Sequence, residues 1–364
     1  MAKLGDFIEQ IRGVSYKPED LHTSLNENSI VLLRANNIKD GRLNFEDVVY
    51  VDRKKVSNKQ IIKKGDILIC TSSGSKGLVG KAAYVDGDLP MTFGAFCKVV
   101  RPRVECPQYI GHFFNSTYYR ERITSFAAGA NINNIRNEHI DDLEITWPSL
   151  EQQRNTVELL DKISGLILLR KEQLEKLEQL VKSRFIELMD STELSEEVTV
   201  EQITERVKVG FVGTCEKYYT DASGIPMLRT GNITDHGIDM SDLKYVTLEF
   251  HDKNRKSQIR SGDLLIARHG SNGQANVYDG PEAQCLNAVV IVPNQNVAIS
   301  TFLAGLINSP AVKEQIDRTL VGSTQHVVNT KSIANLVVRI PCLEVQEQYE
   351  AFVEQTDKSK LAIH

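Results

Sequence analysis

The stretch that decides the fold is WPSLEQQRNTVELLDKISGLILLRKEQLEKLEQLVKSRFIELMD, residues 147–190. After Pro148 it contains no further proline, and Gly165 is its one glycine. Apolar side chains recur along it every seven residues, at Leu160, Ile167, Leu174, Val181 and Leu188, with Ile163 and Leu177 in a second row. This heptad spacing predicts a long helix whose apolar seam pairs with another helix. A long packing helix inside one large domain is the alternative.

The start of this helix is also marked in the sequence. Ser149 and Gln152 have the spacing of a capping box directly after Pro148. At a rise of 1.5 Å per residue, about 40 residues make a rod of roughly 60 Å. We therefore interpret residues 148–190 as a spacer that holds two other parts of the chain apart.

The parts on either side of the spacer resemble each other. LLRANNIKDG at 32–41 is echoed by MLRTGNITDHG at 227–237, and IIKKGDILIC at 61–70 by QIRSGDLLIA at 258–267. DLEITWPSLEQQ at 142–153 is echoed by NLVVRIPCLEVQ at 335–346. These and further echoes occur in the same order in both halves, which predicts an internal duplication.

Each half alternates short apolar runs with turn residues, which predicts strands, and carries one amphipathic helical patch before the rod. The predicted fold class is α+β, with two tandem mixed α/β domains at 1–147 and 191–340. Long helices separate them, at 148–190 and, in shortened form, at 341–364. Because the second helix is short, we expect the first helix to lack its partner from Leu174 to Leu188.

Composition agrees with a protein of this kind. A chain of 364 residues has room for two or three domains with cores of their own. No apolar run reaches membrane-spanning length, and the N-terminus has no signal-peptide pattern. The cysteines form no CxxC, which favours reduced, mostly buried thiols in a cytoplasmic protein; they are Cys70, Cys97, Cys106, Cys215, Cys285 and Cys342.

The formal net charge of −5 argues mildly against nucleic-acid binding when taken over the whole chain. The acidic surplus lies in the helical stretch, however, and a local basic face matters more than the sum.

Motifs of catalysis and cofactor binding are absent from the sequence. GSKGLVGK at 74–81 departs from a phosphate-binding loop in its spacing and lacks the Ser or Thr after the lysine. There is no GxSxG, HExxH or dinucleotide fingerprint, and no two histidines have metal-ligand spacing. We therefore predict no catalytic residue, no metal and no cofactor in this chain.

Polar loops at corresponding places in the two halves are the stronger signal. Arg, Lys, Asn, Gln, Ser and Thr read base edges, although Asn and Ser are also ordinary turn residues. The candidate DNA-binding residues of the first half are Arg34, Asn36, Asn37, Ser72, Ser73, Ser75, Lys76, Asn131, Asn133, Asn134 and Arg136. Those of the second half are Arg229, Asn232, Arg268, His269, Ser271, Asn272, Gln274, Ser323, Thr324, Gln325 and His326. The differing side chains suggest two readers of different sequences.

On the paired WPSLEQQ and IPCLEVQ and on the repeated Gly-Asp strands, nearly the whole chain resembles the specificity subunit of Type I restriction–modification systems. The resemblance implies two target recognition domains, each reading one half of a bipartite double-stranded DNA site. It implies that the two helices pair antiparallel about a pseudo-twofold axis and fix the spacing of the halves.

The resemblance also implies the partners. A specificity subunit has no catalytic activity of its own and docks modification subunits, here expected to be two, which methylate adenine with S-adenosylmethionine. Restriction subunits join through them and cut with ATP and Mg²⁺. A stand-alone DNA methyltransferase or nuclease, and an adaptor whose duplicated domains bind protein, are the alternatives.

Overall fold

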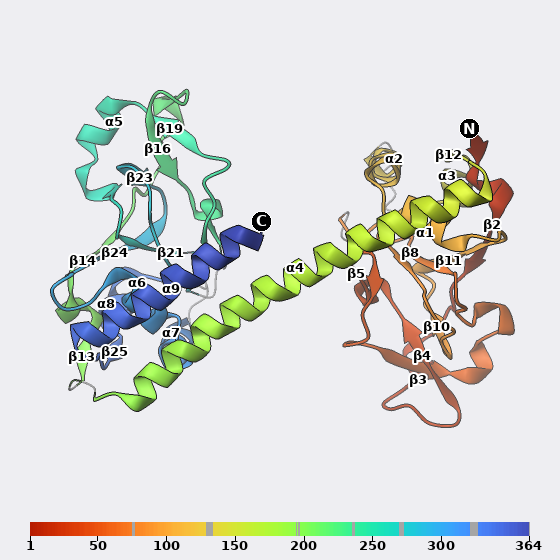
Figure 1. The fold of residues 1–364 in the computed structure, drawn as a ribbon, viewed down its shortest axis with the longest axis horizontal. Coiled ribbons are helices and arrows are strands. Elements are labelled where there is room, and N and C mark those ends of the chain that lie inside the picture. The colour runs from red at the N-terminus through yellow and green to blue at the C-terminus, as the bar shows by residue number, and fades with distance from the viewer. Residues whose placement is uncertain are drawn as a thin grey trace. The chain divides into compact units, whose positions relative to one another are not determined.

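The computed structural model describes residues 1–74, 77–128, 134–193, 195, 197–234, 237–268, 273–320 and 327–363. The chain divides into two compact units, Met1–Leu168 and Leu169–His364 (Figure 1). The long helix α4 (Leu150–Ser191) begins in unit 1 and ends in unit 2.

Unit 1 is built on two four-stranded sheets. The first sheet is antiparallel and has the order β2 (Ile8–Arg12), β11 (Cys97–Pro102), β8 (Ile67–Cys70), β9 (Ala82–Tyr84). The second has the order β10 (Met91–Phe93), β4 (Ser29–Leu33), β7 (Val49–Asp52), β3 (Leu21–His22), with β10 parallel to β4. Helices α1 (Pro107–Phe114), α2 (Thr117–Ala128) and α3 (Asn137–Asp141) follow the last strand of the first sheet.

Strand β8 shows why its sequence contains an uninterrupted apolar run. Successive side chains of a strand point to opposite faces. Ile67 and Ile69 pack into the core beneath the helices, while Leu68 and Cys70 pack into a second core against the other sheet. All four are fully buried, so neither face of β8 has room for a polar residue.

Unit 2 repeats this architecture. Its sheets have the orders β14 (Thr204–Val209), β24 (Ala288–Pro293), β21 (Leu264–Ala267), β22 (Ala275–Val277), and β15 (Tyr219–Thr220), β19 (Lys244–Val246), β16 (Ile225–Leu228), β23 (Ala283–Cys285), β20 (Gln258–Ile259). Its helices are α5 (Leu248–Lys253), α6 (Ser300–Ile307), α7 (Pro310–Leu320), α8 (Thr330–Ala334) and α9 (Leu343–Ile363). Helices α6, α7, α8 and α9 each begin 193 residues after α1, α2, α3 and α4, in that order. Helix α5 has no counterpart among the described helices of unit 1. The predicted duplication is confirmed.

Four short strand pairs complete the units. They are β1 (Ala2–Lys3) with β12 (Glu144–Ile145), β13 (Val198–Thr199) with β25 (Val337–Val338), β5 (Ile38–Lys39) with β6 (Arg42–Leu43), and β17 (Ile233–Thr234) with β18 (Gly237–Ile238). The first two pairs join the beginning of each repeat to the segment just before the long helix that follows it, α4 or α9.

The repeated glutamine of WPSLEQQ and IPCLEVQ anchors the start of each long helix. Gln153 is buried and donates from Nε2 to the Pro148 carbonyl at 2.9 Å. Gln346 is also buried and donates to Pro341 at 3.0 Å, and its Oε1 accepts the Ile299 N–H at 2.9 Å. The predicted capping box is confirmed as well, because the Ser149 and Gln152 side chains each accept the other residue's backbone N–H.

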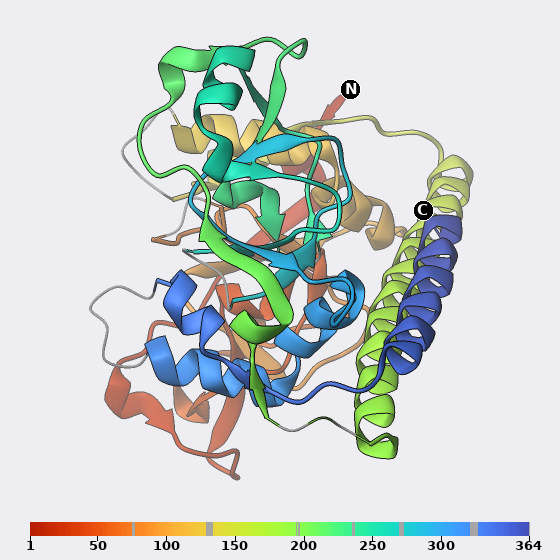
Figure 2. The same cartoon turned by 90° about the vertical axis from the view of Figure 1, so that its left-hand side faces the viewer.

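Within unit 2, the end of α4 and the start of α9 lie side by side in opposite directions (Figure 2). The rings of Phe185 and Tyr349 have centroids 5.3 Å apart, and Arg184 lies 5.9 Å from the ring centroid of Phe352. Gly305 of α6 allows this approach, since a Cβ there would lie 2.8 Å from the Tyr349 hydroxyl. The partner helix predicted by the heptads, and the antiparallel pairing implied by the family resemblance, are confirmed here.

The expectation that α4 is unpaired between Leu174 and Leu188 is wrong. Leu188 is 6% exposed in the unit 2 core, and Val181 packs against the same core. Leu174 and Leu177 are half-buried, as is Leu160. The first turns of an antiparallel α9 meet the last turns of α4, so even a short α9 covers this end. The exposed apolar residues of the seam lie earlier, at Ile163 and Ile167.

Cysteine placement fits the composition. Within the described residues all six cysteines are free thiols, and only Cys342 is exposed. None of the described helices combines the length and the apolar character that a membrane span requires.

Candidate nucleic-acid interface

Two loops that are far apart in the sequence meet in unit 1. Ser72 and Asn134 form an isolated antiparallel bridge, and the Ile135 N–H donates to the Thr71 carbonyl at 2.8 Å. The segment after β8 and the segment before α3 therefore lie side by side. Ser72 and Ser73 are half-buried there, while Asn134 and Arg136 are exposed.

Unit 2 has the same junction with different side chains. The Val328 N–H donates to the Arg268 carbonyl at 3.1 Å, and Arg268 Nε donates back to the Val328 carbonyl at 3.4 Å. Gln274, on the other side of the loop after β21, is half-buried. Both units thus bring together the two loops that contain candidate DNA-binding residues.

The loop between β10 and β11, which connects the two sheets, adds a residue, Phe96, that the sequence pattern does not single out. The Phe96 carbonyl accepts the N–H of Thr71 at 2.9 Å and that of Ser72 at 3.1 Å. Phe96 is 70% exposed. On the other side, the Gly94 N–H donates to the Leu33 carbonyl, directly before the turn that holds Arg34. An exposed aromatic ring therefore stands among the polar loops of unit 1.

In unit 2 the equivalent loop, between β23 and β24, is one residue shorter and carries Asn287 at its tip. Asn287 has a φ of 53°, a left-handed conformation that asparagine tolerates better than most residues. Its carbonyl accepts from the Thr230 hydroxyl at 3.3 Å. The two units therefore present different side chains at this tip.

Arg34 and Arg229 open equivalent turns. Arg34 Nη2 lies 2.9 Å from Asp47 Oδ2, and Arg229 Nη2 lies 3.0 Å from Asp242 Oδ2. The Nε of each guanidinium is buried and has no hydrogen-bond partner within the described residues. Asn36 is exposed and donates to the same Asp47 carboxylate. These three side chains lie at the surface with an acid as their neighbour.

For Asn37 and Asn232, the structure corrects the role in base reading that the sequence suggested. Asn37 is 1% exposed; its Oδ1 accepts the Arg34 N–H at 2.8 Å, and its Nδ2 donates to the Asn44 and Asp47 carbonyls. Asn232, 3% exposed, makes the corresponding three bonds in unit 2. Both amides are fully used in holding the turn, so we reassign them from base reading to structure.

A buried lysine helps to position the loop before α3. Lys98 Nζ donates to Gln10 Oε1 at 2.7 Å and to Asn137 Oδ1 at 2.6 Å, which ties β11 and β2 to the first residue of α3. Desolvation lowers the pKa of Lys98, although carboxylates nearby oppose this. Lys98 therefore acts as a hydrogen-bond donor within the fold and not as a surface charge.

The remaining predicted residues fall outside the described part of the chain: Ser75, Lys76, Asn131, Asn133, His269, Ser271, Asn272, Ser323, Thr324, Gln325 and His326. Among the residues that are described, no group of three or more His, Cys, Asp or Glu side chains could hold a metal ion.

Comparison with known proteins decides the family. Residues 1–179 and 197–364 each match the Type I restriction modification DNA specificity domain. The chain belongs to the specificity subunits of Type I restriction–modification systems.

Individual relatives agree with this assignment. The chain is 30% identical to the Type I restriction enzyme StySPI specificity subunit of Salmonella potsdam and 29% identical to the EcoKI specificity subunit of Escherichia coli. Each match covers 95% of this chain and 79% of the relative. The solved Type I S subunit from M. genitalium has the same fold, with a TM-score of 0.57 at 14% identity over 100% of this chain and 90% of that one.

For this specificity subunit, the two units are therefore target recognition domains. It is a DNA sequence-recognition subunit in which each domain reads one half of a bipartite site, and its partners are DNA and the subunits of a restriction–modification complex.

Proposed function

We propose that this specificity subunit is a non-catalytic cytoplasmic protein that reads an asymmetric bipartite DNA site and docks two modification subunits. The observation that carries the proposal is the duplicated loop junction, which is closed in both units by an equivalent backbone hydrogen bond but carries different side chains. A scaffold that stays constant while its exposed side chains vary is suited to reading two different base sequences.

Under this proposal, methylation of adenine is performed by the modification subunits with S-adenosylmethionine, and cleavage by restriction subunits with ATP and Mg²⁺. The specificity subunit contributes binding and positioning. This division of roles is consistent with the lack of catalytic motifs in its sequence.

The first reader would use Asn36, Ser73, Asn134 and Arg136 with Arg34, together with the Phe96 ring. Side-chain amides and guanidinium groups hydrogen-bond to base edges, and a phenyl ring packs against the methyl group of thymine. Arg34 would have to exchange Asp47 for a base or a phosphate. That exchange is inexpensive, because the Asp47 side chain is 71% exposed and surface ion pairs contribute little.

The second reader would use Arg229, Arg268 and Gln274. No aromatic ring stands at the position equivalent to Phe96, so we expect its half-site to be recognised by polar contacts. The predicted loop residues outside the described part of the chain, on both readers, stay candidates for base contacts.

A domain exchange tests the proposal. Residues 1–147 are replaced by the first domain of a related subunit, and methylated adenines are mapped in cells that carry the modification subunit. We expect one half of the methylated sequence to change while the other half and the spacing stay the same. If both halves are unaffected, or if the wild-type complex binds DNA without sequence preference, the chain is an adaptor and not a reader.

A further inference from the structure

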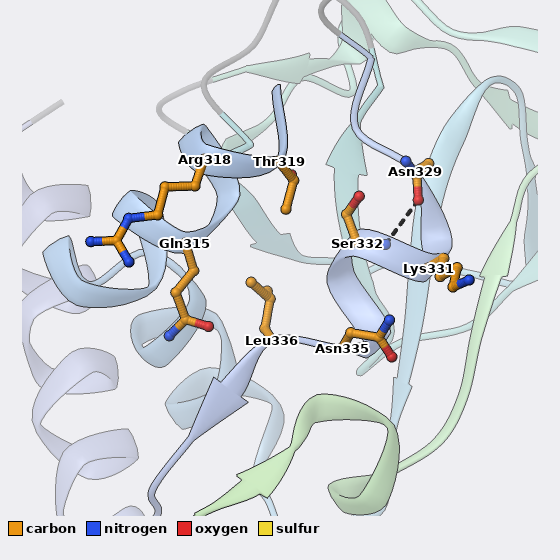
Figure 3. Close-up of a pocket in the computed structure, with 8 residues that line it drawn as sticks. All are labelled: Gln315, Arg318, Thr319, Asn329, Lys331, Ser332, Asn335 and Leu336. Carbon is orange, nitrogen blue, oxygen red and sulfur yellow. Dashed lines mark hydrogen bonds between the residues drawn. The ribbon is translucent and has the colours of Figure 1, made fainter. Parts of the chain in front are cut away.

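A pocket of about 440 Å³ opens in unit 2 between α7 and α8 (Figure 3). Gln315, Arg318 and Thr319 line it from α7, and Lys331 and Ser332 from α8. Asn329, Asn335 and Leu336 complete the lining. Thr319 and Asn329 flank the 321–326 segment in which the sequence suggests readers.

The same place in unit 1 is filled. Phe126 and His139 are the counterparts of Thr319 and Ser332, by the constant shift of 193 residues between the helices. Their rings stack with centroids 4.8 Å apart and planes 9° from parallel. The Arg122 guanidinium, at the position of Gln315, lies 5.7 Å from the centroid of the Phe126 ring. The pocket therefore exists because unit 2 has two small hydroxyl residues where unit 1 has an aromatic stack.

The charge around this place is reversed between the units. Glu138 and Asp142 of unit 1 are replaced by Lys331 and Asn335 in unit 2. Asp142 is held by Lys3 at 2.7 Å. The filled position thus has acidic residues beside it, whereas the open one has a lysine and an amide.

The donors of the pocket fall into two groups, those that form bonds within the described residues and those that do not. The Gln315 amide donates to the Val337 carbonyl and accepts the Val337 N–H. The Thr319 hydroxyl donates to the Ile316 carbonyl, and Arg318 forms an ion pair with Glu314 at 2.6 Å. For the side chains of Lys331, Ser332 and Asn335, the described residues offer no hydrogen-bond partner. An ammonium, a hydroxyl and an amide are the donors that commonly contact nucleic-acid phosphates.

An unstacked base fits the pocket less well. Proteins that hold single bases stack them on aromatic side chains, and no aromatic residue lines this pocket. A phosphate needs only donors and positive charge. We propose that this pocket binds a backbone phosphate of the DNA beside the second half-site, which fixes the position of unit 2 on the duplex without reading sequence.

The test uses the complex of this chain with its modification subunits and measures DNA affinity at several salt concentrations. Each phosphate contact contributes about 0.9 to the slope of log K against log salt concentration. We expect Lys331→Gln to reduce that slope by about this amount and to weaken binding several-fold for every DNA sequence. The matched control is Lys244→Gln, an exposed lysine of β19 that does not line the pocket, which should leave both quantities unchanged.

A second variant, Thr319→Phe with Ser332→His, rebuilds the unit 1 stack in unit 2. We expect the same loss of slope, with the mapped methylation sequence unchanged. An unaltered slope in both variants overturns the proposal, as does a changed base preference in one half-site. Failure to assemble with the modification subunits before DNA is added would instead make the pocket a protein-docking site and also overturn it. If the wild-type complex has no sequence preference, it is the proposed function that fails.

Discussion

Arg101 holds the buried carboxylate of Asp66 with two hydrogen bonds, from Nε to Oδ1 at 2.7 Å and from Nη2 to Oδ2 at 2.8 Å. Asp263 occupies the same Gly-Asp turn in unit 2, where its Oδ2 likewise accepts the backbone N–H three residues earlier. The residue of β24 that is equivalent to Arg101 is apolar. No salt bridge to Asp263 is found within the described residues. The two repeats thus keep the turn and differ in how the buried charge is balanced.

The first prediction follows from this difference. Asp66→Asn removes the acid that neutralises a largely buried guanidinium and should lower the free energy of unfolding by about 2–4 kcal/mol. Asp263→Asn keeps the turn, because an amide oxygen also accepts the Arg260 N–H, and should cost less than about 1 kcal/mol. Thermal unfolding of both variants measures the contrast; equal destabilisation would contradict it.

The second prediction concerns pH. Burial raises the pKa of Asp263 above its ordinary value of 3.8, against smaller opposing effects of the Arg260 N–H and Lys208. The folded state therefore binds this proton more tightly than the unfolded chain, and the stabilisation is lost as the pH rises from the unfolded to the folded pKa. We expect Asp263→Asn to gain stability relative to the wild type over that range and then to level off. Denaturant unfolding at a series of pH values measures the difference, and a difference that shrinks as the pH rises would show the sign to be wrong.

A third prediction tests the helix pair. Phe185 is 5% exposed and contacts Tyr349 and Phe302, so Phe185→Ala should cost about 3–5 kcal/mol in unit 2. Ile167→Ala, on the exposed part of the same helix, should change stability by less than about 0.5 kcal/mol. Hydrogen exchange read peptide by peptide should show α9 losing protection in the first variant alone. Equal effects of the two substitutions would mean that the α4–α9 pairing is wrong.

The fourth prediction separates reading from structure within one turn. Asn37→Ala leaves backbone groups without their buried partner and should lower stability by about 2–3 kcal/mol. Asn36→Ala, one residue earlier and exposed, should leave stability unchanged and weaken DNA binding by the complex. Unfolding curves and DNA affinity are measured on both variants. A stable Asn37→Ala protein would show that the buried amide does not hold the turn.

The fifth prediction concerns the exposed ring at the β10–β11 tip. Phe96→Ala should leave the free energy of unfolding unchanged, because the residue is already 70% exposed. We expect it to relax base preference at one position of a single half-site, worth about 1–3 kcal/mol of discrimination. Mapping methylated adenines reads this directly. Asn287→Ala, in the equivalent loop of unit 2, is the control and should leave the half-site read by unit 1 unaltered.

How far sequence reasoning reached depended on the range of the interactions. The capping box of Ser149 and Gln152, the heptads and the repeated Gly-Asp turns are local patterns, and the structure has them where the sequence indicates. Asn37 resembled any exposed turn asparagine, because its burial depends on loop carbonyls up to ten residues away. No sequence pattern points to Phe96. Its place beside the polar loops comes from hydrogen bonds that its carbonyl accepts from the N–H groups of Thr71 and Ser72, about 25 residues away in the sequence.

The sequence by itself determined the duplication, the two kinds of element in each repeat and the place where the long helix begins. Repeats, periodicity and caps are all properties of neighbours along the chain. Only the tertiary structure decided which end of α4 is covered, which asparagines are buried and where unit 2 has a pocket that unit 1 has filled. Those outcomes depend on packing between segments remote in sequence, where the size of one side chain decides whether a space is closed or open.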